Sequence, residues 1–338
     1  MERKVAVISG VTGKYGSSLA QLLLDKDYRV IGLYRRNSSE AFEELKKLGL
    51  YDKIELVEFD LLEISNIAKL FNRVQPDEFY NLDTNVNEEM SWENPVYATV
   101  ENGLSVINLL EMIREFSPKT KLFQASSYKM LGDAKNDYKG DCLVCAPKSP
   151  YATSKLFGHW IITNYNESFN LFACSGVLYE SENPYSLSDK FLKNTLDYLV
   201  KYCAGQTDSL YETENKIYDL SYAGDFALGM WTMLQQQKPD WYLLANGKNH
   251  SIKDFINECS KHLGLNIEWA SENDFVTGTD VKTGQMIIKL HNVPEQNAGD
   301  IEKTKSALDW ETKVSFEELC KMIVEERIKK NNNIPALV

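Results

Sequence analysis

Three side chains of this sequence have the types and the order that a hydride-transfer site needs. The segment QASSYKMLG carries an apolar run, residues 121–125, into Ser127, and the later segment SPYATSK holds Tyr151 and Lys155. A separation of four residues puts the tyrosine and the lysine on one face of a helix. The lysine charge favours ionisation of the phenol, so Tyr151 can take a proton from an alcohol whose oxygen Ser127 hydrogen-bonds. The pattern indicates oxidation of an alcohol or the reverse reduction, with these three as catalytic residues.

A hydride needs an acceptor, and a glycine loop near the start of the chain indicates a dinucleotide. The segment SGVTGKYGSSLA follows an expected strand, Val5 to Ser9, and opens an expected helix, about Gly16 to Lys26. Glycines in this context allow a tight turn, close approach of the backbone to a pyrophosphate and close packing of helix on strand. The helix N-terminus offers free N–H groups to the phosphates. We therefore predict dinucleotide contacts at Gly10, Thr12, Gly13 and Gly16.

The second expected strand ends in GLYRRNSS, which bears on the choice between the two nicotinamide dinucleotides. NAD sites usually carry an acidic residue here for the ribose 2′-hydroxyl, whereas an arginine accommodates a 2′-phosphate. Arg35 and Arg36 without an acid favour NADP(H), with NAD(H) as the alternative. Asp60 and Leu61 close the third strand and are expected to face the adenine. The predicted set of cofactor-binding residues also includes Leu82, Tyr151, Lys155 and Leu178.

Alternating strands and helices over the first 180 residues must position these side chains. Apolar runs at residues 5–9, 29–33, 54–58, 78–82, 121–125 and 171–177 predict strands, with helical patterns between them. Such alternation predicts right-handed βαβ units and an α/β fold with a doubly wound parallel sheet covered on both faces. Ligands bind beyond the carboxyl ends of such strands.

The pattern changes after Pro184 to helices with fewer strands. Residues 189–203, 251–263 and 315–330 are predicted helices, with Ser251 as a predicted N-cap. We expect a smaller, mainly helical C-terminal substrate lobe that closes over the carboxyl edge of the sheet. The predicted dinucleotide-binding domain comprises residues 1–178 plus about 216–232, and the predicted lobe comprises about 179–215 and 233–338.

Composition and charge narrow the class of protein. An apolar fraction of 43% and a charged fraction of 25% over 338 residues are ordinary for a globular chain. No run approaches the ~18 to 20 apolar residues that span a bilayer, and the start shows no signal-peptide pattern. The formal charge of −12 disfavours nucleic acid and anionic membranes as partners. We expect a cytoplasmic protein.

Cysteine and histidine usage does not predict a metal site. Six cysteines are scattered along the chain, and Cys142 and Cys145 have the spacing of half a zinc site. Neither a second pair nor a histidine cluster completes the ligand set. Reduced cysteines agree with the expected cytoplasmic compartment.

Together the glycine loop, YRRNSS, FYNL and SPYATSK resemble an extended short-chain dehydrogenase/reductase. The chain is most similar to the GDP-mannose 4,6-dehydratase branch of the NAD-dependent epimerase/dehydratase family, through NYNESFNLFACSGVLYESENP, DFALGMWTMLQ and GDIEKTKSALDW. The resemblance implies a Rossmann fold, a nucleotide-diphosphate sugar (first of all a GDP-sugar) as substrate, and Tyr151 as base at its 4-hydroxyl. It also implies a homodimer built on helices around residues 95–116 and 151–168, or a tetramer that also meets near the loop after the second strand.

Several positions depart from that family's pattern. The family has Thr-Ser-Glu where this chain has Ser127, Tyr128 and Lys129, and dehydration needs the glutamate to remove the C5 proton. A positive Lys129 cannot abstract that proton, but it can lie beside a substrate oxygen or phosphate. The family's NLAA is NLDT here, which brings the carboxylate of Asp83 near the expected cofactor.

The expected substrate lobe also departs from the family. Glu180 stands in place of an asparagine and Tyr218 in place of an arginine, and no arginine occurs between residues 114 and 327. Lys193 is then among the nearest cations for a diphosphate. The predicted substrate-binding residues are Ser127, Lys129, Glu180, Lys193 and Tyr218.

Three functions remain open on these residues. The leading one is reversible hydride transfer at a nucleotide-sugar carbon, C4, by a dehydrogenase, reductase or epimerase, because Ser127, Tyr151 and Lys155 suffice for it. The second is a true 4,6-dehydratase with a replaced acid/base. The third is a cofactor-binding pseudoenzyme with a structural or regulatory role.

Overall fold

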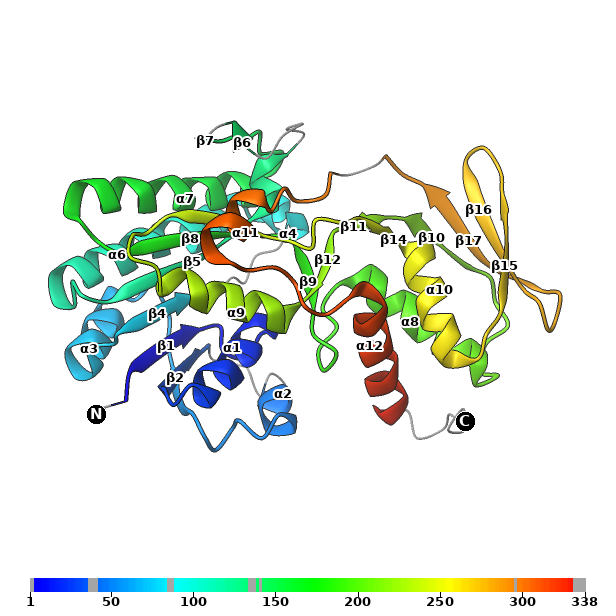
Figure 1. Ribbon diagram of the computed structural model, residues 1–338, viewed down its shortest axis with the longest axis horizontal. Helices are drawn as coiled ribbons and strands as arrows, with labels where there is room; N and C mark the ends of the chain where they lie inside the picture. Colours follow the sequence, from blue (N-terminus) through cyan, green and yellow to red (C-terminus); the bar gives the residue numbers. More distant parts are fainter. Residues whose placement is uncertain are drawn as a thin grey trace. The chain divides into compact units, whose positions relative to one another are not determined.

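The computed structural model describes residues 3–35, 42–83, 88–132, 138–139, 142–294 and 297–330. The chain divides into two compact units, each drawn in Figure 1. Unit 1 comprises Met1–Tyr179, Ala223–Leu244 and Asp300–Glu311, and unit 2 comprises Glu180–Tyr222, Ala245–Gly299 and Thr312–Val338.

A seven-stranded parallel sheet forms the centre of unit 1 and confirms the predicted fold class. The strand order is β13-β8-β5-β4-β1-β2-β3, and every neighbouring pair is parallel. Their apolar residues are buried because helices cover both faces. In chain order the strands are β1 (Val5–Ser9), β2 (Arg29–Tyr34), β3 (Glu55–Glu58), β4 (Glu78–Asn81), β5 (Lys121–Ser127), β8 (Ala173–Leu178) and β13 (Trp241–Leu244).

Helices α1 (Lys14–Asp25) and α9 (Ala223–Leu234) pack together on one face of the sheet, and α3, α6 and α7 cover the other (Figure 1). Residues of α3 (Ile64–Val74), α6 (Ser105–Phe116) and α7 (Pro150–Phe169) share a core cluster with strand residues such as Ile31 and Phe79. The remaining elements of unit 1 are α2 (Phe42–Lys47), α4 (Glu88–Glu93), α5 (Pro95–Thr99), the π-helical turn η1 (Val100–Leu104), the 3-10 turn η2 (Tyr128–Leu131), the hairpin of β6 (Tyr138–Lys139) with β7 (Cys142–Leu143), and α11 (Glu302–Leu308).

Unit 2 is the smaller lobe and combines helices with a mixed sheet. Its main sheet has the order β10-β17-β16-β15, in which the β10–β17 pair is parallel and the others antiparallel. Helices α8, α10 and α12 share one core with these strands, around residues such as Leu199, Phe255 and Ile288. The elements are β9 (Glu180–Glu182), α8 (Lys190–Cys203), β10 (Tyr211–Asn215), β11 (Ile217–Tyr218), β12 (Leu220–Tyr222), β14 (His250–Ser251), α10 (Ile252–Leu263), β15 (Ile267–Ser271), β16 (Phe275–Asp280), β17 (Met286–Asn292) and α12 (Phe316–Lys330).

The division into units differs from the sequence expectation in three segments. Residues 216–222 belong to unit 2, because β11 pairs with β14 and β12 pairs with β9. Residues 233–244 belong to unit 1, because β13 extends the parallel sheet beside β8. Residues 300–311 also belong there, because α11 packs on β13 and the Thr304 hydroxyl donates to the Leu243 carbonyl at 2.7 Å.

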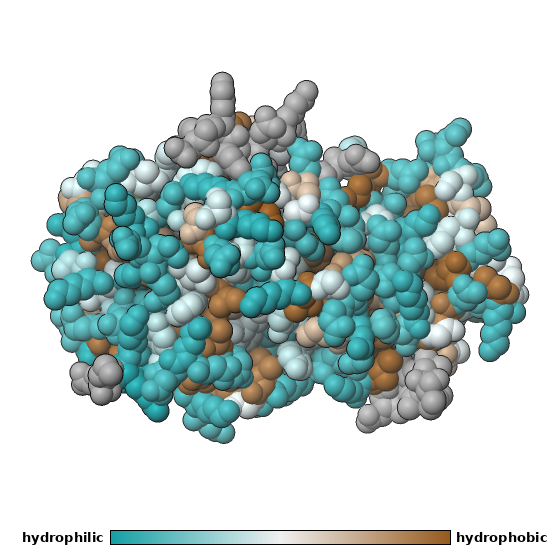
Figure 2. Space-filling model, in the orientation of Figure 1, coloured by the Kyte–Doolittle hydropathy of each residue, from teal (hydrophilic) through white to brown (hydrophobic). Residues whose placement is uncertain are grey.

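Hydrophilic residues dominate the face of the protein seen in Figure 2, and hydrophobic residues appear on it as separate patches. Within the described ranges, no helix is long and apolar enough to cross a membrane.

Candidate active site

The glycine loop joins β1 to α1 in a conformation that only small residues permit. Gly10 has φ +70°, and a Cβ on Gly16 would lie 2.2 Å from the Gly10 carbonyl oxygen. Gly13 is the N-cap of α1; no side chain caps it, and no acidic residue lies in the first turn. The positive end of the α1 dipole therefore faces the glycine loop without an acidic side chain in the first turn, and this favours an anion there. This loop fits the pyrophosphate of a dinucleotide.

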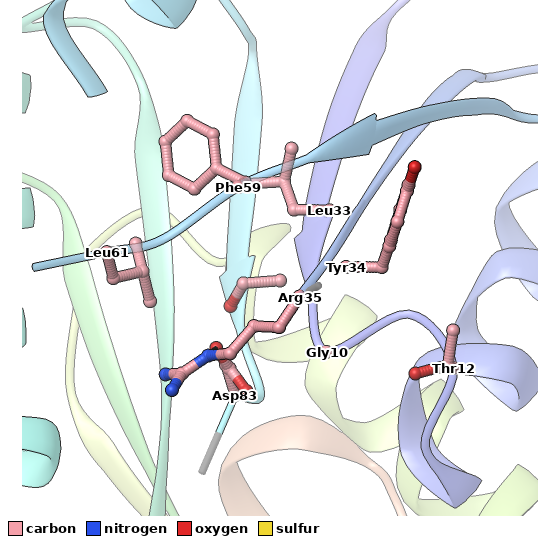
Figure 3. A pocket seen from close by; sticks show the side chains of 9 residues that line it. Gly10, Thr12, Leu33, Tyr34, Arg35, Phe59, Leu61 and Asp83 are labelled. Carbon is pink, nitrogen blue, oxygen red and sulfur yellow. Dashed lines mark hydrogen bonds and ion pairs between the residues drawn. The ribbon is translucent and has the colours of Figure 1, made fainter. Parts of the chain in front are cut away.

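A cavity of about 70 Å³ lies at the carboxyl ends of β1 to β4, next to the glycine loop (Figure 3). Of the predicted cofactor-binding residues it is lined by Gly10, Thr12, Arg35 and Leu61, whereas Gly13, Gly16, Asp60, Leu82 and Leu178 do not line it. The cavity is also lined by four residues that the sequence did not predict, Ser9, Leu33, Tyr34 and Phe59, and by Asp83, which was expected only as a carboxylate near the cofactor. Arg36 lies outside the described residues.

Arg35 crosses this cavity to two carboxylates instead of pointing outward (Figure 3). Its Nε donates to Asp83 Oδ2 at 2.8 Å, and its two terminal nitrogens donate to the Glu101 carboxylate at 3.1 and 2.6 Å. The Glu101 side chain is 1% exposed. Burial raises the pKa of Asp83, against the charge of Arg35, which lowers it. Burial alone would lower the pKa of Arg35, but Glu101 and Asp83 raise it above its ordinary value.

The three predicted catalytic residues all belong to unit 1, on β5 and α7. Ser127 ends β5 and caps η2, since its Oγ accepts from the Lys129 N–H at 3.3 Å. Helix α7 begins at Pro150, capped by Ser149, and carries Tyr151 and Lys155 in its first turns. Lys155 Nζ donates to the Ala125 carbonyl at 3.3 Å and lies 5.7 Å from the centre of the Tyr151 ring. Lys155 thus ties the strand that ends in Ser127 to the helix that carries Tyr151.

Lys155 is almost completely buried, with 4% of its surface exposed. Burial lowers its pKa to about 8, opposed by the charges of Asp83 and Glu101. Asp83 and Glu101 therefore interact with two cations: they form ion pairs with Arg35, and their charges raise the pKa of Lys155. The four charges sum to zero, which makes their joint burial acceptable.

Lys129 has a carboxylate partner that the sequence analysis did not find. Its Nζ lies 3.4 Å from Glu88 Oε2 at the start of α4 and 4.9 Å from the centre of the Tyr128 ring. Both side chains of the pair are about a third exposed. The lysine two residues after Ser127 is therefore paired with the carboxylate of Glu88.

The other predicted substrate-binding residues belong to unit 2. Glu180 begins β9 and Tyr218 ends β11; the Tyr218 hydroxyl donates to Asp189 Oδ1 at 3.3 Å. Burial raises the pKa of Tyr218 far above its ordinary value, and the charges of Asp189 and Glu180 raise it further. Lys193, on α8, lines a different cavity of about 190 Å³ together with Arg327 of α12. Among the described residues, no group of three or more His, Cys, Asp or Glu side chains could hold a metal ion.

Fold and loop together define the class of protein. A parallel sheet with a glycine loop before α1, and Tyr151 and Lys155 on the helix that follows β5, places the chain in the extended short-chain dehydrogenase/reductase superfamily of NAD-dependent epimerases and dehydratases. The family model described as GDP-mannose 4,6 dehydratase matches residues 7–323. The chain belongs to the GDP-mannose 4,6-dehydratase family, as its motifs predicted.

One relative and two solved structures illustrate the likeness. The GDP-mannose 4,6 dehydratase of Dictyostelium discoideum is 31% identical over 350 residues, which cover 98% of each chain. The dTDP-glucose 4,6-dehydratase of Bacillus anthracis, solved in complex with NAD, has a TM-score of 0.76 at 17% identity and covers 97% of this chain and 98% of its own. RMD from Pseudomonas aeruginosa, complexed with NADPH, has a TM-score of 0.73 at 15% identity, with coverages of 97% and 99%. The two structures share the fold.

Proposed function

We propose that this chain is a nicotinamide-dependent oxidoreductase that transfers hydride at C4 of a nucleotide-diphosphate sugar, with a GDP-sugar as the substrate class. The observation that carries the proposal is the position of Lys155, whose Nζ donates to the Ala125 carbonyl of β5 and lies 5.7 Å from the centre of the Tyr151 ring. Membership of the GDP-mannose 4,6-dehydratase family supports the substrate class.

In this proposal each catalytic residue of unit 1 has a separate role in the hydride transfer. Tyr151 removes the proton of the 4-hydroxyl, and the Lys155 ammonium stabilises the phenolate that takes part. Ser127 hydrogen-bonds the oxygen on which charge develops. In the reverse direction Tyr151 returns the proton to that oxygen. The glycine loop and the residues around Thr12 and Leu61 would hold the dinucleotide, which supplies the hydride acceptor or donor when bound.

Cations for a nucleotide diphosphate are available in unit 2. Lys193 shares its cavity with Arg327 and with Lys330, whose Nζ donates to the Tyr185 carbonyl at 2.8 Å. Arg327 also pairs with Asp197 of α8. Lys193 and Arg327 offer the type of charge-assisted contact that diphosphates need.

The test is to incubate the protein with GDP-, UDP- and dTDP-sugars and either dinucleotide, and to follow products by chromatography that separates epimers, coupled to mass spectrometry. We expect a product two mass units lighter than one GDP-sugar, or an epimer of it. Tyr151→Phe should reduce the rate by at least about 100-fold, the usual scale of general acid–base catalysis, while dinucleotide affinity stays unchanged. Absence of turnover with every sugar, with cofactor bound, would instead support the pseudoenzyme.

A second candidate function is 4,6-dehydration with a replaced acid/base. The contact between Lys129 and Glu88 favours it, because it places a carboxylate beside the position at which the family resemblance expects one. In this scheme Tyr151 acts at C4 as hydride leaves for the dinucleotide, the Glu88 carboxylate removes the C5 proton, and the same group gives it to the departing C6 hydroxyl as water leaves. C6 of the resulting 4-keto-5,6-ene then takes back the hydride, and C5 takes a proton from solvent through Glu88.

Solvent deuterium separates the two candidates. A dehydratase gives a 6-deoxy-4-keto sugar and incorporates deuterium at C5, whereas simple hydride transfer does neither. If Glu88 is the acid/base, Glu88→Gln abolishes C5 exchange, and Glu89→Gln, which removes an exposed carboxylate next to it on α4, does not. C5 exchange that survives Glu88→Gln would exclude this role of Glu88.

A further inference from the structure

The first residue after β2 has a special place in sites of this kind, because it lies where the 2′ substituent of the adenosine ribose is recognised. In this chain that residue is Arg35, and its guanidinium is held by Asp83 and Glu101 through three hydrogen bonds. Figure 3 shows Arg35 extending toward Asp83 across the cavity that Gly10 and Thr12 border.

The contacts that hold Arg35 are buried and difficult to exchange. Side-chain exposures are 19% for Arg35, 14% for Asp83 and 1% for Glu101. The two-point contact with Glu101 matches the planar fork of the guanidinium. If Arg35 turned toward a phosphate, two buried carboxylates would lose their principal partner, and uncompensated buried charge is costly.

The charge balance of the cluster formed by Arg35, Asp83, Glu101 and Lys155, of which Arg35 and Asp83 line the cavity, also disfavours an added phosphate. Arg35 and Lys155 carry two positive charges, and Asp83 and Glu101 carry two negative ones. A 2′-phosphate adds between one and two further negative charges, on a wall that already presents the Asp83 carboxylate. A ribose 2′-hydroxyl adds none, and it can donate a hydrogen bond to a carboxylate, which is how NAD sites recognise it.

We propose that Asp83 and Glu101 withhold Arg35 from a 2′-phosphate, so that the dinucleotide site selects NAD(H) over NADP(H), with Asp83 as the specificity-determining residue. The inference rests on the proposed function, because it assumes that a dinucleotide binds at the glycine loop. It reverses the expectation from the RRNSS segment, which counted Arg35 as available. Arg36 lies outside the described residues and is no part of the argument.

The experiment is calorimetric titration of the full chain with NADH and with NADPH. We expect the wild-type protein to bind NADH with a Kd at least tenfold lower than that of NADPH. Asp83→Asn keeps the shape of the side chain and releases Arg35 from one carboxylate; it should lower the Kd for NADPH at least tenfold and so lower the ratio of the NADPH Kd to the NADH Kd. Glu101→Gln, a second route to the same release, should act in the same direction.

One control variant tests whether removing any carboxylate changes the cofactor preference, and a second tests whether the gain in NADPH affinity requires Arg35. Asp77→Asn removes a carboxylate at the opposite end of β4, where it accepts from the Val5 N–H, and should leave the ratio of the two Kd values unchanged. Adding Arg35→Ala to Asp83→Asn should cancel the gain in NADPH affinity. The melting temperature of each variant shows that it is folded.

The outcomes are distinguishable. Tighter binding of NADPH by the wild-type protein overturns the inference and leaves the proposed function intact, and so does a preference for NADH that neither Asp83→Asn nor Glu101→Gln alters. Binding of neither dinucleotide overturns the inference and the proposed function together.

Discussion

At residue 155 the chain buries an ammonium group that the proposed chemistry needs in its charged form. Burial lowers the pKa of Lys155 to about 8, and Asp83 and Glu101 keep it from falling further. At pH 7 the group is still mostly protonated, so it can stabilise ionised Tyr151. The two carboxylates therefore contribute to the proposed hydride step without touching substrate.

The same pKa makes a prediction about stability. The pKa of Lys155 in the folded chain, about 8, is lower than its ordinary value of 10.5. The unfolded chain therefore binds more protons between these pH values, and the free energy of unfolding rises with pH across this window. Over it, the wild-type protein should gain on the order of 3 kcal/mol relative to Lys155→Met. Urea unfolding of both proteins at pH 7 to 10.5 measures the difference; parallel curves would contradict the assignment.

Contacts between residues that are close in the sequence could be predicted, and contacts between residues that are far apart in it could not. Tyr151 and Lys155 are four residues apart, so the helix itself joins them. Arg35 and Glu101 are 66 residues apart, and their contact exists only because η1 lies beside the ends of β2 and β4. The expectation of NADP(H) came from the identity of Arg35 alone and could not include its ion-pair partners. The preference of the protein for NAD(H) or NADP(H) therefore stays a prediction.

At the scale of elements, the joint between β1 and α1 is the tightest part of the proposed cofactor site. A methyl group on Gly16 would meet the Gly10 carbonyl oxygen at 2.2 Å and the Val11 Cα at 2.6 Å. Gly16→Ala should therefore lower the free energy of unfolding by about 3 kcal/mol, at the upper end of the usual cost of overpacking, and abolish dinucleotide binding. Gly49→Ala is the control: its φ of +63° costs about 1 to 2 kcal/mol, but no atom lies within 4 Å of the new methyl group. It should leave binding unchanged in calorimetry.

Helix α10 shows what local sequence predicts well. Ser251 was an expected N-cap, and its hydroxyl accepts from the Asp254 N–H at 3.2 Å while Asp254 Oδ2 accepts from the Ser251 N–H at 2.8 Å. Ser251→Ala should cost about 1 kcal/mol of stability. Ser251→Asn, which keeps a capping oxygen, should stay within a few tenths of the wild-type value in urea unfolding. Equal losses for both variants would show that the cap is not the cause.

The strands of unit 2 escaped the sequence analysis for a physical reason. β15 has the sequence IEWAS, and three of its five residues are exposed, so it lacks a continuous apolar run. In unit 1, the missed strand β13 has four residues and begins seven residues after helix α9 ends. Such strands are stabilised by the sheet neighbours that they find, β16 and β8, which lie outside any local window.

At the scale of the whole molecule, exposed apolar side chains favour the homo-oligomer that the resemblance implies. Val96 of α5 is 77% exposed, and Phe157 and Trp160, three residues apart on α7, are each more than 40% exposed. α5 and α7 contact each other. Phe157→Asp should therefore shift the protein to monomer in sedimentation at micromolar concentration, while Val281→Asp, which changes an exposed apolar residue of unit 2, should not. A wild-type monomer would remove this proposal.

The discontinuity of unit 1 has a consequence for synthesis on the ribosome. β8 is buried at all six positions and pairs with β13 on its outer side, but β13 begins 63 residues after β8 ends. At about 5 to 20 residues per second, a nascent chain holds this apolar edge strand without its outer neighbour for roughly 3 to 13 s. Unpaired edges of this kind recruit other chains. Messenger RNAs truncated between codons 179 and 240 should therefore give polypeptides that aggregate. A recombinant unit 1 should stay free of aggregates only if residues 223–244 and 300–311 are joined to residues 1–179.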